Sequence, residues 1–229
     1  MTISFIGGGV MAESFIAGVL KEGLFSSDQI YVSDPIADRR KYLTDTYGVN
    51  CLKENIDILE KKGKILLAVK PQTLPEVYKD LKGKISPERP VISIVAGSKS
   101  SDLSKGLEHQ QIIRVMPNTP SQIGKGMLVW TSTDEVDPTA IGEIASILKT
   151  LGEEYYVHDE KYMDMATALS ASGPAYVFLF IQSLIDSGVY LGMPRDMAKH
   201  LVLQTVLGST ELLLESGKHP SVLSDMVTS

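Results

Sequence analysis

The sequence of 229 residues predicts an α/β fold, in which a parallel sheet covered by helices on both faces precedes an all-helical segment. Up to residue 158, short runs rich in Val, Ile and Leu alternate with stretches of apolar residues at helical spacing. After about residue 159 no convincing strand pattern follows. We therefore expect two domains, residues 1–158 and residues 159–229.

The predicted elements follow from this alternation. Strands are expected at 3–6, 29–33, 64–69, 90–96, 112–116, 127–131 and 154–157. Helices are expected at 11–20, 38–47, 74–81 and 138–151, then at 159–170, 174–192 and 194–215, with a further helix starting near His219 and Pro220. The helix at 138–151 is a typical case, since Pro138 lies near its first turn and Gly152 just past its end.

Composition excludes several classes of protein. Hydrophobic residues make up 43% and charged residues 22% of the chain, and the net charge is −6, so the basic surface of a nucleic-acid-binding protein is not expected. The single cysteine, Cys51, can form no intramolecular disulfide, and the four histidines lack metal-ligand spacing, so no metal site is expected. The N-terminus does not resemble a signal peptide, which indicates a cytoplasmic location.

The stretch 175–191 is almost entirely apolar, but polar residues such as Gln182 and Asp186 interrupt it. We expect it to be too short and too polar to span a bilayer, so no membrane association is predicted. A helix that is apolar on all sides must be buried on all sides, and about seventy residues cannot easily bury it alone. We therefore expect it to pack against the first domain or a second copy of the chain. A homodimer is favoured over a central helix in a monomeric helical layer.

A glycine-rich loop follows the first predicted strand. Residues 7–12 fit the pattern G-x-G-x-x-G/A and open an amphipathic helix. Gly7 permits the tight turn, Gly9 lets the backbone approach a pyrophosphate, and Ala12 lets helix and strand pack closely. The helix N-terminus then offers N–H groups to the phosphates. The loop predicts a Rossmann-like dinucleotide-binding domain, and the alternative is a tight turn with no ligand.

The residues after the second strand bear on the choice of coenzyme. Asp34 lies 22 residues beyond Ala12 and is placed to hydrogen-bond the adenosine ribose hydroxyls, which indicates NAD. However, Ser33 is adjacent, and Arg39 or Arg40 could bind a 2′-phosphate, which would indicate NADP. A solvated helix face is the slightly favoured interpretation of the two arginines. The cofactor is therefore expected to be NADPH or NADH.

Three further loops follow strands of the predicted sheet, at 68–72, 95–97 and 114–120. Each could be a plain turn, but together they line the edge at which such sheets bind ligands. A fourth segment, 170–176, places small hydroxyl residues before a helix expected to begin at Pro174. It could bind a substrate carboxylate at the helix N-terminus, or Ser172 could simply cap the helix.

In this order, these loops resemble those of the pyrroline-5-carboxylate reductase family, and the resemblance covers essentially the whole chain. It implies NAD(P)H-dependent reduction of the C=N bond of 1-pyrroline-5-carboxylate to L-proline, the last step of proline biosynthesis. It also implies a Rossmann domain followed by a helical dimerisation domain, and a homodimer or an assembly of dimers. The matching segments are 5–12, 68–72, 95–97, 114–120, 169–178 and 191–195.

The resemblance also implies site residues. Near the nicotinamide it places Met116 and Asn118, and near the substrate it places Thr167, Ser170 and Ser172. It assigns no general acid, because water or a hydroxyl such as that of Thr167 can supply the proton. The residues that it implies for holding the cofactor are Ile6, Gly7, Gly8, Gly9, Val10, Met11, Ser33, Asp34, Asn55, Ala68, Val69, Lys70, Pro71, Val95, Ala96 and Gly97.

The sequence departs from the family pattern at Val10, where Asn is usual, and at Ala171, where Gly is usual. Family members continue beyond the position of Ser229 with a loop that helps to hold the substrate carboxylate, followed by further helices of the dimer core. A chain that lacked these parts is expected to bind the cofactor but to catalyse poorly. The alternative is thus a catalytically weak, dinucleotide-binding relative with a regulatory role, and a reductase of another cyclic imine or of a hydroxy acid ranks last.

Overall fold

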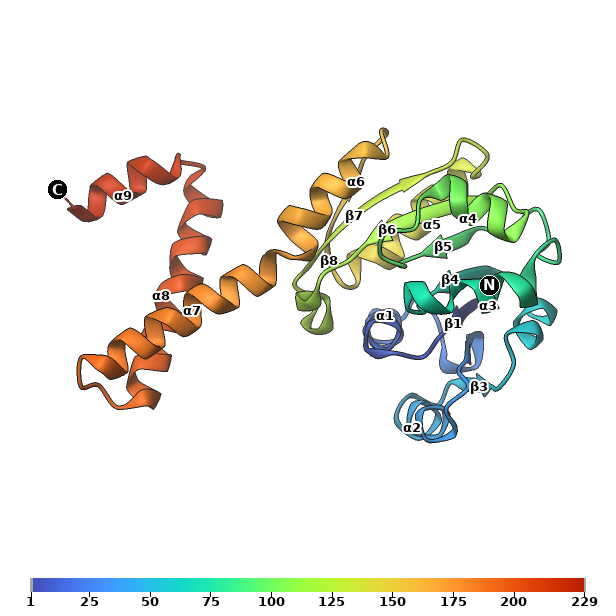
Figure 1. Ribbon diagram of the computed structural model, residues 1–229, viewed down its shortest axis with the longest axis horizontal. Coiled ribbons are helices and arrows are strands. Elements are labelled where there is room, and N and C mark those ends of the chain that lie inside the picture. Colours follow the sequence, from blue (N-terminus) through green and yellow to red (C-terminus); the bar gives the residue numbers. More distant parts are fainter. Residues whose placement is uncertain (1, 229) are drawn as a thin grey trace. The chain divides into compact units, whose positions relative to one another are not determined.

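A computed structural model describes residues 2–228 of the chain (Figure 1). By their contacts, the residues form two compact units, residues 1–172 and residues 173–229. The first unit contains an eight-stranded sheet with helices on both faces, and the second contains helices alone. The α/β class and the helical C-terminal segment predicted from the sequence are confirmed. The domain boundary between residues 158 and 159 stays a prediction.

The sheet has the strand order β3-β2-β1-β4-β5-β6-β7-β8. Strands β1 to β6 pair in parallel, whereas β7 runs antiparallel to β6 and β8 runs parallel to β7. The expectation of a wholly parallel sheet was therefore wrong at β7. The strands are β1 (Ile3–Ile6), β2 (Ile30–Ser33), β3 (Asn50–Leu52), β4 (Lys64–Leu67), β5 (Val91–Ser93), β6 (Ile112–Met116), β7 (Gly126–Ser132) and β8 (Gly152–Tyr156).

Helices cover the sheet on both faces, as Figure 1 shows. One buried cluster joins the sheet to α1, α2 and α5, and a second joins its other face to η2, α3 and α4. The α-helices of this unit are α1 (Val10–Lys21), α2 (Ala37–Tyr47), α3 (Leu74–Leu81), α4 (Ser100–Leu107), α5 (Pro138–Lys149) and α6 (Lys161–Ala166). Short 3₁₀ helices are η1 (Ser27–Gln29), η2 (Asn55–Glu60), η3 (Pro71–Thr73) and η4 (Thr119–Ile123), and a π-helical turn, η5, covers Thr167–Ala171.

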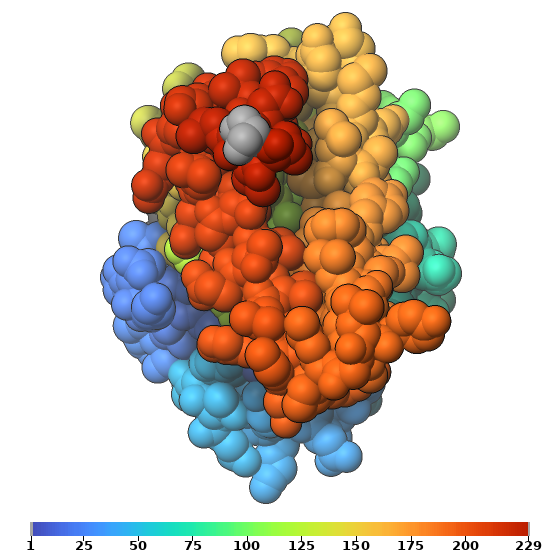
Figure 2. Space-filling model, turned by 90° about the vertical axis from the view of Figure 1, so that its left-hand side faces the viewer, coloured from blue at the N-terminus to red at the C-terminus, as the bar shows by residue number. Residues whose placement is uncertain are grey.

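The second unit consists of α7 (Gly173–Tyr190), α8 (Arg195–Ser216) and α9 (Pro220–Thr228). Helices α7 and α8 lie side by side (Figure 1, Figure 2). Many large apolar side chains of α7 are exposed, among them Phe178 at 60% and Leu179 at 64%. By length and composition alone, the helical stretch Lys161–Tyr190 is long and apolar enough to cross a membrane, and the expectation that residues 175–191 do not span one stays a prediction.

Candidate coenzyme and substrate site

The first candidate site lies where β1 and β4 run side by side at the centre of the sheet. From β1 the sheet continues toward β2 and β3 on one side, and from β4 toward β5 and β6 on the other. Open sheets of this kind bind ligands at such a switch point, beyond the carboxyl ends of the strands. The loop after β1 is the glycine loop, and the loop after β4 begins at Ala68.

The three glycines have different structural roles. Gly7 has a φ of +91°, and a Cβ there would lie 2.8 Å from the carbonyl oxygen of Ala68, so the close approach of the two loops requires glycine. At Gly8 a Cβ would lie 2.8 Å from Leu43. At Gly9, by contrast, φ is −66° and a Cβ would meet nothing within 4 Å.

Open space over a glycine at the start of a helix fits a dinucleotide. Gly9 is the N-cap of α1, where backbone N–H groups and the helix dipole favour phosphate. Gly97, after β5, has a φ of +75°, and a Cβ there would also meet nothing within 4 Å. Ala12 is fully buried between α1 and the sheet, which is the close packing expected of the third position of the motif.

Asp34 holds the glycine loop in place. Its carboxylate is buried and accepts the Gly8 N–H through Oδ2 and the Ile36 N–H through Oδ1, both at 2.9 Å. Just before it, Ser33 donates to Oδ1 of Asn55 at 2.8 Å, and Nδ2 of Asn55 donates to Asp80 at 2.9 Å. The predicted coenzyme residues Ser33, Asp34 and Asn55 are thus gathered around the ends of β1 and β2.

The arginines after β2 do not form a solvated face, so that favoured interpretation was wrong. Arg39 donates from Nε to the carbonyl oxygen of Gly8 and from Nη2 to that of Gly9 and to the carboxylate of Glu13. Arg40 donates from Nη1 to the carbonyl oxygens of Asp34 at 2.7 Å and Pro35 at 2.9 Å. Both guanidinium groups therefore bind the backbone of the predicted coenzyme site.

The other strand-end loops offer a mixture of buried and exposed residues. After β4, Ala68 and Val69 are half-buried, and the Ala68 N–H donates to the carbonyl oxygen of Ile6 at 2.8 Å. Lys70 and Pro71 are exposed, as are Ala96 and Gly97 after β5, whereas Val95 is buried. In the glycine loop, Val10 is 61% exposed and Met11 is half-buried.

Asn118 connects the loop after β6 to the helical segment that carries the predicted substrate residues. Its Oδ1 accepts the Met127 N–H at 2.9 Å, and its Nδ2 donates to the carbonyl oxygen of Ser170 at 3.1 Å. Near it, Met116 is buried in a small cluster with Met163 of α6. The structure therefore brings together the two residues predicted near the nicotinamide and Ser170, one of those predicted near the substrate.

The predicted substrate hydroxyls lie on or next to the π-helical turn η5. The Ser172 N–H donates to the Thr167 carbonyl oxygen at 2.9 Å, so this N–H is not free to bind a substrate carboxylate. The Ser172 backbone is itself helical, with φ −84° and ψ −21°, which rules out the N-cap geometry considered for it. Thr167 and Ser170 donate their hydroxyl protons to carbonyl oxygens one turn earlier, at 2.8 and 2.9 Å. Single π-helical turns often occur at functional sites.

A buried cluster around Arg114 was missed from the sequence. The Arg114 side chain is 2% exposed and donates to Glu160 at 3.0 Å and to Asp164 at 3.2 Å. Glu160 also accepts the N–H and the hydroxyl of Ser100. The cluster fixes the start of α6, and with it the turn that carries Thr167. The sequence did carry a signal, because Arg114 is the one cation in the otherwise apolar run 112–116. A charge in such a buried strand requires a partner of opposite charge.

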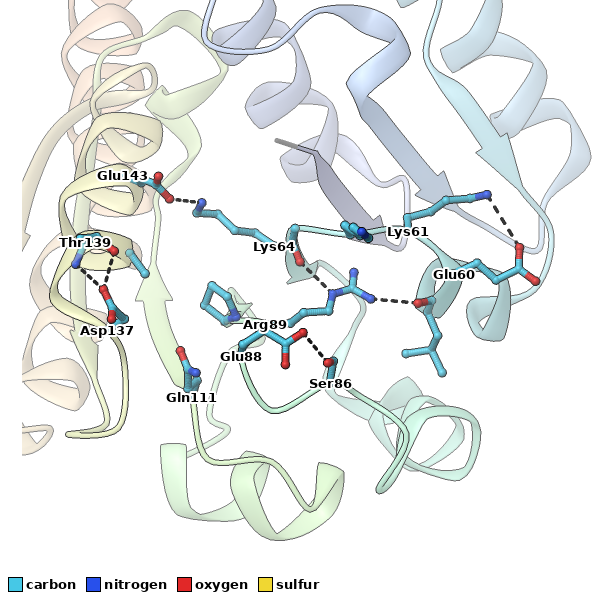
Figure 3. A pocket seen from close by; sticks show the side chains of 15 residues that line it. Glu60, Lys61, Lys64, Ser86, Glu88, Arg89, Gln111, Asp137, Thr139 and Glu143 are labelled. Atoms are coloured by element: carbon cyan, nitrogen blue, oxygen red, sulfur yellow. Dashed lines mark hydrogen bonds and ion pairs between the residues drawn. The ribbon is translucent and has the colours of Figure 1, made fainter.

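A cavity of about 750 Å³ opens at the opposite edge of the sheet, where β4, β5 and β6 begin (Figure 3). Lys64 reaches Glu143 across it, and Arg89 donates from Nε to the Gly63 carbonyl oxygen at 2.8 Å and from Nη1 to that of Leu59 at 3.3 Å. These bonds tie the preceding loops to the sheet. We therefore regard this cavity as structural.

Two known families match different parts of the chain. The family described as pyrroline-5-carboxylate reductase dimerisation matches residues 160–229. The family described as NADP oxidoreductase, coenzyme F420-dependent, matches residues 2–97. The dimerisation match covers the segment in which the apolar side chains of α7 are exposed. Interfaces between subunits are a common reason for such exposed surface.

Relatives of known name cover almost the whole chain. The pyrroline-5-carboxylate reductase of Synechocystis is 42% identical over 228 residues, which are 99% of this chain and 84% of that protein. The solved structure of a pyrroline-5-carboxylate reductase from Coxiella burnetii matches with a TM-score of 0.90 at 32% identity, covering 100% of this chain and 85% of that one. The Plasmodium falciparum enzyme, solved with NADP bound, matches with a TM-score of 0.90 at 31% identity, over 100% of this chain and 84% of that one. The chain belongs to the pyrroline-5-carboxylate reductase family.

Proposed function

We propose that this chain reduces 1-pyrroline-5-carboxylate to L-proline with NADH or NADPH, the last step of proline biosynthesis. The observation that carries the proposal is the hydrogen bond from Asn118 to the Ser170 carbonyl oxygen. It joins the strand-end loop predicted near the nicotinamide to the π-helical turn predicted near the substrate. Hydride transfer needs the nicotinamide and the substrate to be held close together.

The residues of the crevice support binding of a reduced nicotinamide coenzyme, which supplies the hydride. Gly7, Gly8 and Gly9 would hold the pyrophosphate, with the open space over Gly9 admitting it. Ser33, Asp34 and Asn55 would hold the adenosine ribose. The remaining coenzyme residues would be Ile6, Val10, Met11, Ala68, Val69, Lys70, Pro71, Val95, Ala96, Gly97, Met116 and Asn118.

The hydroxyl geometry bears on the protonation of the imine. The Thr167 proton is donated to the Met163 carbonyl oxygen, which leaves lone pairs of Oγ1 to accept a hydrogen bond. A protonated imine N–H could donate to this oxygen, so Thr167 would orient an iminium that has taken its proton from water. Ser170 donates to Ala166 in the same way. Ser172 would contact the substrate from the same segment.

The direct test is a coenzyme oxidation assay. Purified protein is mixed with 1-pyrroline-5-carboxylate and either NADH or NADPH, and the loss of absorbance and the formation of proline are followed together. Proline that forms only when both substrate and coenzyme are present supports the proposal. Coenzyme binding without turnover would contradict it and favour a catalytically weak relative with a regulatory role.

We also propose that the chain forms a homodimer, or an assembly of dimers, through its helical segment. Support comes from the family match to residues 160–229 and from the exposed apolar side chains of α7. Replacing Leu179 by Asp places a charge on this surface and should shift the sedimentation of the protein toward the monomer. The control is Ser101→Asp, which adds the same charge at an exposed position of α4. Equal sedimentation of both variants and the native chain would refute the role of α7.

A further inference from the structure

Four side chains at the start of α1 and along α2 form a connected group, Glu13, Arg39, Tyr42 and Tyr47. Arg39 donates to Oε2 of Glu13, while the hydroxyls of Tyr42 and Tyr47 donate to Oε1 at 2.9 and 2.8 Å. The Arg39 guanidinium also lies over the Tyr42 ring, 5.0 Å from its centroid. Glu13 directly follows the glycine loop, residues 7–12, but lies outside its G-x-G-x-x-G/A pattern.

The group keeps Glu13 ionised. Burial alone would raise the pKa of its carboxyl, but hydrogen bonds from Arg39, Tyr47 and Tyr42 outweigh this and lower the pKa below its ordinary value. Burial and the bond to Glu13 raise the pKa of Tyr47 to about 12, so the tyrosine remains a donor at neutral pH. The Arg39 and Glu13 side chains are 23% and 19% exposed, and a pair this sheltered is screened less by salt than a surface pair.

This arrangement matters because of what a 2′-phosphate requires. In this fold the adenosine ribose lies beyond the end of the second strand, where an acidic residue suits a 2′-hydroxyl and a nearby arginine suits a 2′-phosphate. In this chain the acidic residue at the end of the second strand is Asp34, whose carboxylate accepts the Gly8 N–H. Arg39 stands close by, but its Nε and Nη2 donors are directed to the Gly8 and Gly9 carbonyl oxygens and to Glu13.

We propose that Glu13 is a specificity-determining residue, which competes with the 2′-phosphate of NADPH for Arg39 and so weakens NADPH binding relative to NADH. It is a positioning residue, since it acts through Arg39. The inference rests on the proposed use of a nicotinamide coenzyme. To engage a phosphate, Arg39 must give up a charge-assisted bond to Glu13, and the phosphate must approach two carboxylates, Glu13 and Asp34. NADH meets neither cost.

The test measures coenzyme binding by calorimetry, without the imine, so its outcome is independent of whether the chain reduces 1-pyrroline-5-carboxylate. The quantity compared is the ratio of the NADPH affinity to the NADH affinity. Removing a negative charge near the helix N-terminus strengthens pyrophosphate binding for both coenzymes, and this effect cancels in the ratio. Glu13→Gln keeps an acceptor for Tyr42 and Tyr47 and removes the charge.

We expect Glu13→Gln to raise the ratio of NADPH to NADH affinity about tenfold, because Arg39 can then form one charge-assisted hydrogen bond to the 2′-phosphate. Adding Arg39→Gln to this variant should return the ratio to the native value, whereas Arg39→Gln alone should change it less than about twofold. Glu22→Gln, at the exposed far end of α1, is the charge-matched control and should leave the ratio unchanged.

A ratio for Glu13→Gln within about twofold of the native one would overturn the proposal. So would a raised ratio that persists after Arg39 is replaced, because Glu13 would then act without Arg39. If Glu13→Gln does not fold, as judged by the absence of a cooperative urea unfolding transition, Glu13→Asp serves instead. It keeps the charge but shortens the side chain, so it should also raise the ratio by releasing Arg39, and an unchanged ratio would overturn the proposal in the same way.

Discussion

Replacing Gly9 by Ala should separate coenzyme binding from folding. Gly9 has a φ of −66°, which any residue adopts, and its added Cβ would meet nothing within 4 Å. Gly7 is the matched comparison, since it has a φ of +91° and its Cβ would lie 2.8 Å from the Ala68 carbonyl oxygen. The same added methyl group thus falls in open space at one position and on the backbone at the other.

The magnitudes follow from these surroundings. Gly9→Ala should change the stability of the coenzyme-free protein by less than about 1 kcal/mol, because the conformational freedom lost by the unfolded chain offsets the poorer fit of alanine at the N-cap of α1. Its methyl group would occupy the space that we assign to the pyrophosphate, and overpacking of this kind costs about 1–3 kcal/mol, or roughly tenfold to a hundredfold in affinity. Gly7→Ala should destabilise the protein by at least about 1–2 kcal/mol from its backbone conformation alone.

Two assays check the pair of variants. Urea unfolding without coenzyme gives the change in stability, and calorimetric titration with NADH gives the change in affinity. The expected result is a Gly9→Ala protein whose stability lies within about 1 kcal/mol of the native one but which binds NADH at least about tenfold more weakly. Unchanged NADH binding by this variant would refute the placement of the pyrophosphate over Gly9, and a stable Gly7→Ala protein would refute the structural role of Gly7.

Three further predictions concern other parts of the first unit. Asn118→Ala leaves the Met127 N–H without its acceptor and should lower the free energy of unfolding by about 1–3 kcal/mol in urea, and an unchanged midpoint would contradict this. Glu160→Ala removes a partner of the buried Arg114 and should cost about 3 kcal/mol in the same assay, whereas Glu160→Gln, still an acceptor for the guanidinium, should cost less. Burial lowers the pKa of His109 below its ordinary value of 6.5, so an unfolded chain takes up a proton that the folded one does not. The contribution of His109 to the free energy of unfolding should therefore be fully present above pH 6.5 and should be lost as the pH falls below it. In urea unfolding at about pH 7.5 and about pH 5.5, His109→Gln should show a smaller loss of stability between the two pH values than the native chain.

The parts of the fold that the sequence predicted well are those with strong local signals. Strand β1, the glycine loop and helix α1 follow from one apolar run, one motif and one amphipathic stripe, and the structure places each where it was expected. Helix α5 was expected over 138–151, from Pro138 near its first turn and Gly152 past its end, and it covers Pro138–Lys149. The Asp137 carboxylate accepts the Thr139 N–H at 2.7 Å, which is the capping bond of a helix start.

The parts that were missed lack such signals or depend on partners distant in the sequence. Strand β3 is only three residues long, and helix α4 is short and half polar. Gly106 lowers the helix propensity of α4, yet it is needed there, because a Cβ would lie 2.5 Å from the Tyr78 ring of α3. The antiparallel direction of β7 could have been predicted, since residues 117–125 are too few for the crossover of a dozen or more residues that a parallel neighbour needs.

The candidate site shows the same limit at the level of single side chains. The sequence placed arginines after β2 and hydroxyls before α7, but it could not state which partners these groups bind within the chain itself. Arg39 binds the glycine loop and Glu13, so its presence does not by itself indicate a 2′-phosphate site. The Thr167 hydroxyl donates its hydrogen bond to the Met163 carbonyl oxygen, so a hydroxyl next to the substrate does not by itself indicate a proton donor. In both cases the hydrogen bonds that the side chain makes within the protein decide which of its donors and acceptors remain for a ligand. Those bonds are set by the tertiary structure, so the sequence alone does not reveal them.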